Sequence, residues 1–282
     1  MTKSDTYQII TERVLEKMDQ GIVPWQQPWV GGQAPANFVS KRPYRGVNIL
    51  MTMLQGYASP YWLTFNQAKT LGGHVRKGER GTPLVLWKFL KKTDAEGNED
   101  TIPLIRYFTV FNTEQVDGLT VTIPGLPDVA APVEAAEALV QAFLAAHPGL
   151  RLQVGGTRAY YRPSEDVVQM PERAAFRSTS EYYGTLFHEL VHATGHESRL
   201  KRDLKGYAMD RASYSHEELT AEIGASFLLH AAGLEAEPMD NSIAYLKSWV
   251  RKLQDDHKAI VQAAGRAQRA VDLVLGASAG EA

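Results

Sequence analysis

The chain has 282 residues, a length that favours two domains, and its 44% hydrophobic and 22% charged residues are ordinary for a globular protein. No apolar run reaches the roughly 18 residues of a membrane-spanning helix, which excludes that class of protein. Cysteine is absent, so disulfides and cysteine–zinc sites are excluded, and any metal must be bound by His, Asp or Glu. The polar, amphipathic N-terminus lacks the apolar core of a signal peptide, and we therefore expect a cytoplasmic protein.

Basic and aromatic residues are concentrated in the first part of the chain. The net charge of −2 divides into +3 for residues 1–118, which hold 14 basic and 11 acidic residues, and −5 for the remainder. Between Asn37 and Lys92, ten basic residues accompany a single acidic residue, Glu79. Four of the five tryptophans also precede residue 118. The two halves of the chain therefore have different chemistry.

The N-terminal half predicts short helices followed by a β-hairpin. Apolar residues recur at helical spacing in the first segment, which Gly21 and Pro24 end. A polar, glycine-containing tip, DAEGNED, separates two strand patterns, and we assign it no function. The predicted helices cover residues 6–20, Gly46–Gln55 and Thr64–Leu71, and the predicted strands cover Thr82–Lys92 and Ile102–Phe111.

A segment rich in proline and small residues, TIPGLPDVAAP, predicts a linker at residues 124–132 between domains at 1–123 and 133–282. Beyond it the pattern is a helix, a small sheet and more helices. The helices are predicted from Pro132 to Pro148, from a cap at Ser178 or Ser180 to about Gly195, from about Ser215 to Ala232, and almost continuously from Ser242 to Leu275; the strands are Arg151–Val154 and Val167–Met170. The fold class is therefore α+β in two domains, the second mostly helical with a small sheet.

The sequence FHELVHATGH contains the motif H-E-x-x-H within a predicted helix. His188 and His192 lie one turn apart on the same helix face, so both imidazoles reach one ion. Glu189 lies about 100° around the helix, where it contacts a metal-bound water without binding the metal. Zinc lowers the pKa of that water, and Glu189 takes its proton. The pattern is typical of zinc peptidases and predicts Glu189 as the catalytic carboxylate.

Such a site needs a third protein ligand. Gly195 is expected to end the helix before His196, and Ser198 stands where the longer motif HExxHxxGxxH requires histidine, so that motif is excluded. The next helix carries Glu218 and Glu222 on one face, at i and i+4. This E-x-x-A-E element resembles glutamate-liganded zincins such as thermolysin, in which the first acid binds the metal and the second orients a ligand histidine. The resemblance implies Glu218 as the third ligand and Glu222 as its supporting acceptor, and the reverse assignment stays open.

The surroundings of this site are less determined by sequence. Glu217 is expected to point away from the metal, into solvent. The strand Val167–Met170 is expected to be the sheet edge that pairs with an extended peptide, by analogy with zincins. The ligand set suits zinc and also accepts manganese and other divalent ions. Four residues are candidate donors to an oxyanion, and the sequence does not choose among them: His196, Tyr207, Tyr214 and His216.

Cations and aromatic rings alternate in the N-terminal half, as single-stranded nucleic acid requires for phosphate contacts and base stacking. A solvated basic face with core aromatics is the competing interpretation. We expect Phe65, Trp87 and Phe108 to belong to the core, because they lie in apolar periodic segments. The candidate DNA-binding residues are Lys41, Arg42, Tyr44, Arg45, Tyr61, Trp62, Arg76, Lys77 and Arg80.

Six segments in both halves of the chain point to a known family. They are PWQQPW, KRPYRGVNIL, GYASPYWLTFNQAKTLGGHVRKGERGTPLVLW, RYFTVFNTEQVDGL, FHELVHATGHESRL and EELTAEIGASFL. In this order they resemble the ArdC-type antirestriction proteins of conjugative plasmids, over nearly the whole chain. The resemblance implies an N-terminal domain that binds single-stranded DNA, a C-terminal zincin-like metallopeptidase domain, and protection of incoming plasmid DNA from host restriction.

The resemblance also implies partners and a cofactor. Single-stranded DNA is the expected partner, with duplex DNA and subunits of host restriction enzymes as further candidates, and Zn²⁺ or another divalent metal such as Mn²⁺ is the expected cofactor. Two alternatives stay open. One is a cytoplasmic metallopeptidase whose N-terminal domain binds protein partners, and the other is a DNA-binding protein whose metal is structural. No residue pattern identifies a peptide substrate.

Overall fold

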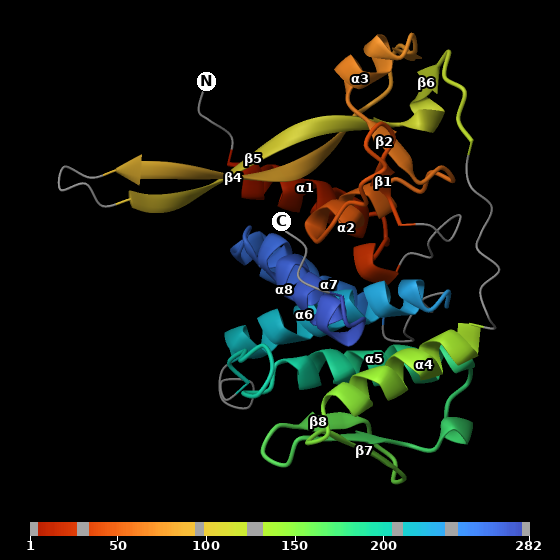
Figure 1. The fold of residues 1–282 in the computed structure, drawn as a ribbon, viewed down its shortest axis with the longest axis vertical. Coiled ribbons are helices and arrows are strands. Elements are labelled where there is room, and N and C mark those ends of the chain that lie inside the picture. Colours follow the sequence, from red (N-terminus) through yellow and green to blue (C-terminus); the bar gives the residue numbers. More distant parts are fainter. Residues whose placement is uncertain are drawn as a thin grey trace.

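The computed structural model describes residues 5–26, 34–93, 99–122, 132–204, 211–234 and 242–277 (Figure 1). Its N-terminal half combines short helices with small sheets and one long two-stranded ribbon. The helices and 3-10 turns are α1 (Thr6–Met18), η1 (Pro24–Gln26), α2 (Val47–Met53), α3 (Phe65–Thr70) and η2 (Thr113–Gln115). The strands are β1 (Ala36–Asn37), β2 (Tyr61–Leu63), β3 (His74–Val75), β4 (Thr82–Thr93), β5 (Glu99–Asn112) and β6 (Val116–Asp117). The helices and the hairpin predicted for this half are confirmed, whereas its short strands carry too few residues to leave a pattern.

Side-chain caps fix where the short N-terminal helices begin. At the start of α1 the backbone N–H of Tyr7 donates to Asp5 Oδ1 at 3.0 Å. At the start of α3 Thr64 and Gln67 form a reciprocal capping box, with N···O distances of 3.2 and 2.8 Å. Each cap satisfies amide groups that a helix of this length would otherwise leave unpaired.

The largest sheet has the strand order β1-β2-β5-β4. Its β4 and β5 pair antiparallel without interruption from Thr82↔Val110 to Thr93↔Glu99. Leu84 and Val110, at the base of this ribbon, are fully buried, and β4 packs there against α1 and α2. Further along, the ribbon extends past the helices (Figure 1). We call this ribbon of β4 and β5 the arm.

The C-terminal half consists of five helices and a three-stranded sheet among the described residues. The helices are α4 (Pro132–Ala146), α5 (Thr179–Thr194), α6 (Arg211–Ala231), α7 (Ser242–Asp255) and α8 (Ala259–Val274), with the 3-10 turn η3 (Arg173–Ala175); the strands are β7 (Arg151–Val154), β8 (Tyr160–Arg162) and β9 (Val167–Met170). Together with the N-terminal half, these elements confirm the α+β class. Sequence reasoning missed β8, which is only three residues long.

The expected edge strand, Val167–Met170, is the central strand of this sheet, and that prediction is wrong. The order is β7-β9-β8, with β9 parallel to β7 and antiparallel to β8. Both backbone edges of β9 are therefore paired within the protein, and no peptide can add there. Three of its four side chains are buried, which is why the pattern reads as an ordinary apolar strand.

The helical pattern predicted as nearly continuous from Ser242 to Leu275 forms two helices, α7 and α8. At the break Asp256 Oδ1 accepts the backbone N–H of Lys258 at 2.8 Å, a local turn. The hydroxyl of Thr11, on α1, donates to the carbonyl of His257 at 2.8 Å. The break between α7 and α8 thus combines a local turn with a hydrogen bond from the distant helix α1.

α7 and α8 lie between the N-terminal helices and the rest of the C-terminal half (Figure 1). Trp25 packs edge-to-face on Trp249 of α7, with 5.9 Å between ring centroids. Arg45 forms an ion pair with Asp272 of α8. One cluster of buried side chains runs through both halves. The predicted linker at 124–132 lies outside the described residues except for Pro132, where α4 begins, and among the described residues no helix is long and apolar enough to cross a bilayer.

Candidate metal centre

The helix α5 carries the H-E-x-x-H motif, and local sequence fixes both its ends. Ser178 Oγ accepts the backbone N–H of Glu181 at 3.0 Å at the N-terminus. Gly195 follows the last helical residue, as predicted, so His196 does not continue the helix. His192 and Glu189 are buried, because α6 and α8 both pack against this helix.

The helix α6 approaches α5 closely at Gly224. A Cβ at that position would lie 2.7 Å from Val191 Cγ2, well inside van der Waals contact. A glycine therefore permits the close packing of the two helices. Since α8 covers α6 from another side, most of the described side chains of α6 are buried. This packing holds the acidic residues of α6 beside the motif histidines.

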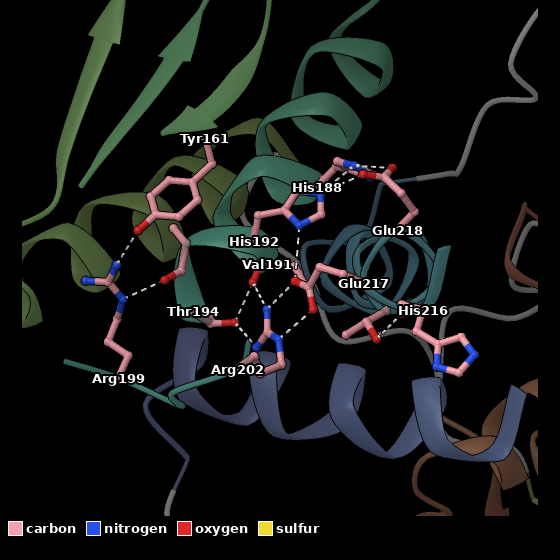
Figure 2. Close-up of polar contacts among 12 residues, drawn as sticks. Tyr161, His188, Val191, His192, Thr194, Arg199, Arg202, His216, Glu217 and Glu218 are labelled. Carbon is pink, nitrogen blue, oxygen red and sulfur yellow. Dashed lines mark hydrogen bonds and ion pairs between the residues drawn. The ribbon is translucent and has the colours of Figure 1, made fainter. Parts of the chain in front are cut away.

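His188, His192 and Glu218 bring three ligand atoms together, as predicted (Figure 2). The two histidine Nε2 atoms lie 3.1 Å apart. The Glu218 carboxylate oxygens lie 3.5 Å from His188 Nε2 and 3.5 Å from His192 Nε2. A tetrahedral ion with bonds of about 2.0–2.1 Å separates its ligand atoms by about 3.3–3.4 Å. The triangle therefore fits a divalent ion without rearrangement, and these residues form a candidate divalent-metal site.

The outer ring nitrogen of His192 faces Glu217, which the sequence had placed in solvent. His192 Nδ1 lies 3.1 Å from Glu217 Oε1, and Glu217 is buried. The expectation for Glu217 is therefore wrong. Its physical reason is that α6 is buried on two sides, so two adjacent residues of the helix both point inward. A carboxylate on Nδ1 fixes the tautomer that leaves Nε2 available to a metal.

Arg202, which no sequence signal singled out, holds Glu217 in place (Figure 2). Its guanidinium donates to Glu217 Oε2 at 3.0 Å and to Oε1 at 2.8 Å, a bidentate pair. The same group donates to the Val191 carbonyl at 2.6 Å and to Thr194 Oγ1 at 2.8 Å, at the C-terminal end of α5. A Cβ on Gly195 would lie 3.0 Å from Arg202 Nη2, so the glycine leaves room for this contact. Arg202 thus joins the C-terminal end of α5 to Glu217 of α6.

Electrostatics at the three ligand residues follow from burial and from their carboxylate neighbours. Burial lowers the pKa of His192, but hydrogen bonds to Glu217 and Glu218 outweigh it and raise that pKa to about 9. Burial also lowers the pKa of His188, but the hydrogen bond to Glu218 and the nearby carboxylates outweigh it and raise that pKa above its usual value. Burial raises the pKa of Glu218, and the two histidines outweigh it and lower that pKa. Without metal the cluster therefore favours protonated imidazole and ionised carboxylate.

Glu189 and Glu222 lie close enough to His188 to raise its pKa by their charge. For Glu189 this position, next to the ligand on the same helix, is the one predicted for a catalytic carboxylate. For Glu222 it places the carboxylate near the first histidine, whereas Glu217 serves the second. The supporting role predicted for Glu222 stays a prediction, and it concerns His188.

The candidate oxyanion donors are dispersed. His196 Nδ1 bonds Ser198 Oγ at 2.8 Å, in the turn after α5. His216 Nε2 lies 3.4 Å from Asp256 Oδ2, at the start of the α7–α8 break, and so faces away from the ligand triangle (Figure 2). Tyr207 and the side chain of Tyr214 lie outside the described residues. Nothing in the described geometry brings a candidate donor to the metal triangle.

The candidate DNA-binding cations are mostly exposed, and several are paired. Arg42 and Lys77 are exposed, and Lys41 Nζ lies over the Phe38 and Tyr61 rings at 4.1 and 4.0 Å. The other cations have acidic partners: Arg45 pairs with Asp272, Arg76 with Glu79 and Asp117, and Arg80 with Glu16.

The aromatic assignments in this half are corrected by burial. Trp62 and Tyr61, expected to stack on bases, are only 2% and 8% exposed, because β2 lies inside the sheet; Tyr44 is half-buried. Phe65 and Trp87, expected in the core, are 56% and 44% exposed. Phe108 packs against the core, as expected. Apolar periodicity alone did not distinguish the inner strand β2 from the projecting arm.

Two family models match the chain. The model described as the N-terminal domain of anti-restriction factor ArdC matches residues 4–111, and the one described as a zincin-like metallopeptidase matches residues 135–266. The two matched segments follow the order expected from the motifs.

Solved structures match over almost the whole length. The chain is 40% identical to the metal-free crystal structure of the antirestriction ArdC protein from plasmid R388, with a TM-score of 0.76 over 96% of this chain and 97% of that one. It is 38% identical to the Mn(II)-bound structure of that protein, with a TM-score of 0.77 over 99% and 100% of the chains.

Curated relatives differ in length. Uncharacterized protein y4eC of Sinorhizobium fredii is 38% identical over 96% of this chain and 92% of its own. Two proteins from Escherichia coli named DNA primase TraC are 36% and 37% identical over 97% of this chain. The chain spans only 20% and 27% of those two primases.

Proposed function

Because this chain belongs to the ArdC family of antirestriction proteins, we propose that it protects DNA entering a cell on a conjugative element from host restriction. The observation that carries the proposal is the full-length match to an antirestriction protein of a plasmid, with both halves in the same order. The alignment with two proteins named DNA primase TraC supports a function on DNA.

The N-terminal half is proposed to bind DNA, single-stranded DNA above all. The excess of basic residues between Asn37 and Lys92 and the exposure of Arg42 and Lys77 support phosphate contacts in this half. Lys41, whose ammonium group lies over the Phe38 and Tyr61 rings, is exposed as well, which supports a phosphate contact by this residue. Arg76 and Arg80 are exposed too, and a phosphate would replace the exposed acidic partners Asp117 of Arg76 and Glu16 of Arg80.

The C-terminal half is proposed to act as a metallopeptidase. His188, His192 and Glu218 would hold a divalent ion, which when bound lowers the pKa of a coordinated water and polarises a peptide carbonyl. Glu189 would accept the proton of the attacking water and pass it to the leaving amine. Glu217 and Arg202 would keep His192 oriented. His192 and Glu189 are buried, whereas His188 and Glu218 are partly exposed, so the peptide and the attacking water would approach the ion from the side of His188 and Glu218.

Transfer of a plasmid into a restricting and a non-restricting host tests the antirestriction role. We expect the wild-type chain to raise transfer into the restricting host only. Equal transfer with and without the chain would contradict the proposal.

Glu189→Gln separates catalysis from metal binding, because it preserves shape and leaves the three ligands intact. If proteolysis is used, this variant loses protection while binding metal as the wild type does. If protection survives in Glu189→Gln but is lost in His188→Ala together with thermal stability, the metal is structural and the peptidase assignment fails.

A further inference from the structure

The arm formed by β4 and β5 has an unusual surface where it leaves the body of the protein. Leu84 and Val85 are buried at its base, but the next residues, Leu86 and Trp87, are 45% and 44% exposed. On the facing strand Tyr107 is 47% exposed. Large apolar side chains exposed together on a two-stranded ribbon contribute nothing to a core, and such a surface marks a site of interaction.

The register places the two rings on one face. Trp87 pairs with Ile105 and Val85 pairs with Tyr107, so Trp87 and Tyr107 are diagonal neighbours on the same side of the ribbon. Diagonal neighbours lie roughly 7–8 Å apart, about twice the 3.4 Å between nucleotides stacked in one strand. The rings are therefore spaced for bases that have been pulled apart, as in an extended single strand, and not for a stacked duplex.

Cations occupy the other face. Lys88 and Arg106 are both exposed, and the register of Lys88 with Leu104 and of Leu86 with Arg106 makes these two cations diagonal neighbours as well. The arm is a ribbon of only two strands, so long basic side chains can reach around its edges to the aromatic face. Rings on one face, with long cationic side chains that reach past the edges from the other face, provide stacking and phosphate contacts together.

Charge along the arm favours a nucleic acid over a protein partner. Residues 81–93 and 101–113 contain four basic residues, Lys88, Lys91, Lys92 and Arg106, and no acidic residue. Within residues 81–113, acidic residues are confined to the segment 94–100, which ends with the first two residues of β5. A polyanion is therefore attracted along the strands and repelled from the tip, which limits the contact to the part of the arm nearest the body.

We propose that this part of the arm is the surface on which the protein binds single-stranded DNA, with bases stacked on Trp87 and Tyr107 and phosphates contacted by Lys88 and Arg106. The inference rests on the proposed DNA-binding function and names its site. It replaces Tyr61 and Trp62, which are buried, as the stacking residues. The arm would bind DNA in addition to the exposed cations Arg42 and Lys77.

The test is fluorescence anisotropy of a labelled oligothymidylate titrated with the full-length protein at several salt concentrations. We expect Trp87→Ala and Tyr107→Ala each to weaken binding about 5- to 150-fold, the loss of one stacked base, with an unchanged salt dependence. Trp87→Phe, which keeps a ring, should retain most of the affinity. Lys88→Ala and Arg106→Ala should each reduce the slope of log K against log salt by about 0.7.

Two controls make the result specific. Phe65→Ala removes an exposed ring outside the arm, and Leu86→Ala removes an exposed apolar group that is not aromatic; both should bind the oligonucleotide as the wild type does. Wild-type affinity in the two ring variants, or an equal loss in Phe65→Ala, overturns the assignment to the arm, and an equal loss in Leu86→Ala overturns base stacking on the two rings. A wild-type protein that binds no oligonucleotide refutes the proposed DNA binding itself. Self-association that is lost in Trp87→Ala would instead make the arm an interface between copies, which also overturns the proposal.

Discussion

His192 Nδ1 lies 3.1 Å from Glu217 Oε1, and this contact connects the metal-site histidine to a residue that binds no metal. Glu217→Gln keeps the size of the side chain but removes its charge. Because the oriented, electron-rich imidazole depends on that carboxylate, we expect affinity for Mn²⁺ or Zn²⁺ to fall about 10- to 100-fold. Isothermal titration calorimetry measures this metal affinity. Glu197→Gln, the same change at an exposed position after α5, should have no effect.

The same titration of Glu222→Gln decides which acid is the main support of the ligand histidines. If Glu222→Gln loses metal affinity and Glu217→Gln does not, the role assigned to Glu217 is wrong and the prediction from the E-x-x-A-E element is correct.

Arg202→Ala should destabilise the protein strongly. The change leaves the buried Glu217 carboxylate without its bidentate partner and removes two contacts at the end of α5. Breaking a buried pair in this way costs about 3–5 kcal/mol of unfolding free energy. Urea unfolding of the metal-free protein measures it, with Arg158→Ala, an exposed arginine, as the matched control. A change below 1 kcal/mol (roughly the value of a surface pair) would mean that water replaces the arginine.

Gly224→Ala and Gly265→Ala form a matched pair in neighbouring helices. A Cβ at Gly224 would collide with Val191, whereas a Cβ at Gly265, in α8, meets nothing within 4 Å. Overpacking should cost Gly224→Ala about 1–3 kcal/mol of stability and weaken metal binding by separating α5 from α6. Gly265→Ala should stabilise the protein by about 0.4–1 kcal/mol. Thermal unfolding with and without metal measures both, and equal effects of the two substitutions would refute the close helix contact.

Metal affinity should rise with pH. Since the pKa of His192 is raised to about 9 in the metal-free protein, its imidazole is protonated at neutral pH and must lose that proton to bind a metal. We expect the apparent affinity to increase about tenfold per pH unit for each proton released, until the pH reaches that pKa. Titration calorimetry in buffers of different ionisation enthalpy counts the protons.

The stability of the metal-free protein should have the opposite trend. A raised pKa means that the folded state binds the proton more tightly than the unfolded state. The contribution of His192 is therefore complete below its ordinary pKa of 6.5 and is lost as pH rises through about 9. Denaturant midpoints of the metal-free protein should fall over this range, and midpoints that rise instead would contradict the sign of the pKa shift.

Local sequence was sufficient to predict those features that lie within one helix or one hairpin. The spacing of His188 and His192 follows from 3.6 residues per turn, Gly195 ends α5, and the polar, glycine-containing sequence between the two strand patterns predicted the antiparallel pairing of β4 with β5. Helical spacing placed both Glu218 and Glu222 on one face of the next helix, and the resemblance to glutamate-liganded zincins favoured Glu218, which lies beside the two histidines. Each of these features depends only on residues that are close together in the chain, so the sequence pattern alone predicts it.

Only the tertiary structure decided which side of each element is buried. Glu217 points inward because α6 is covered by both α5 and α8, and Arg202 reaches it from a turn without any pattern. Trp62 and Trp87 lie in similarly apolar segments, yet an inner strand buries the first and a projecting ribbon exposes the second. Burial depends on packing partners far away in the chain, and no local period encodes them. The sequence by itself therefore narrowed the candidate metal ligands to His188, His192 and either Glu218 or Glu222, whereas the structure brought Glu218 to the two histidines and determined what supports them and where DNA is proposed to bind.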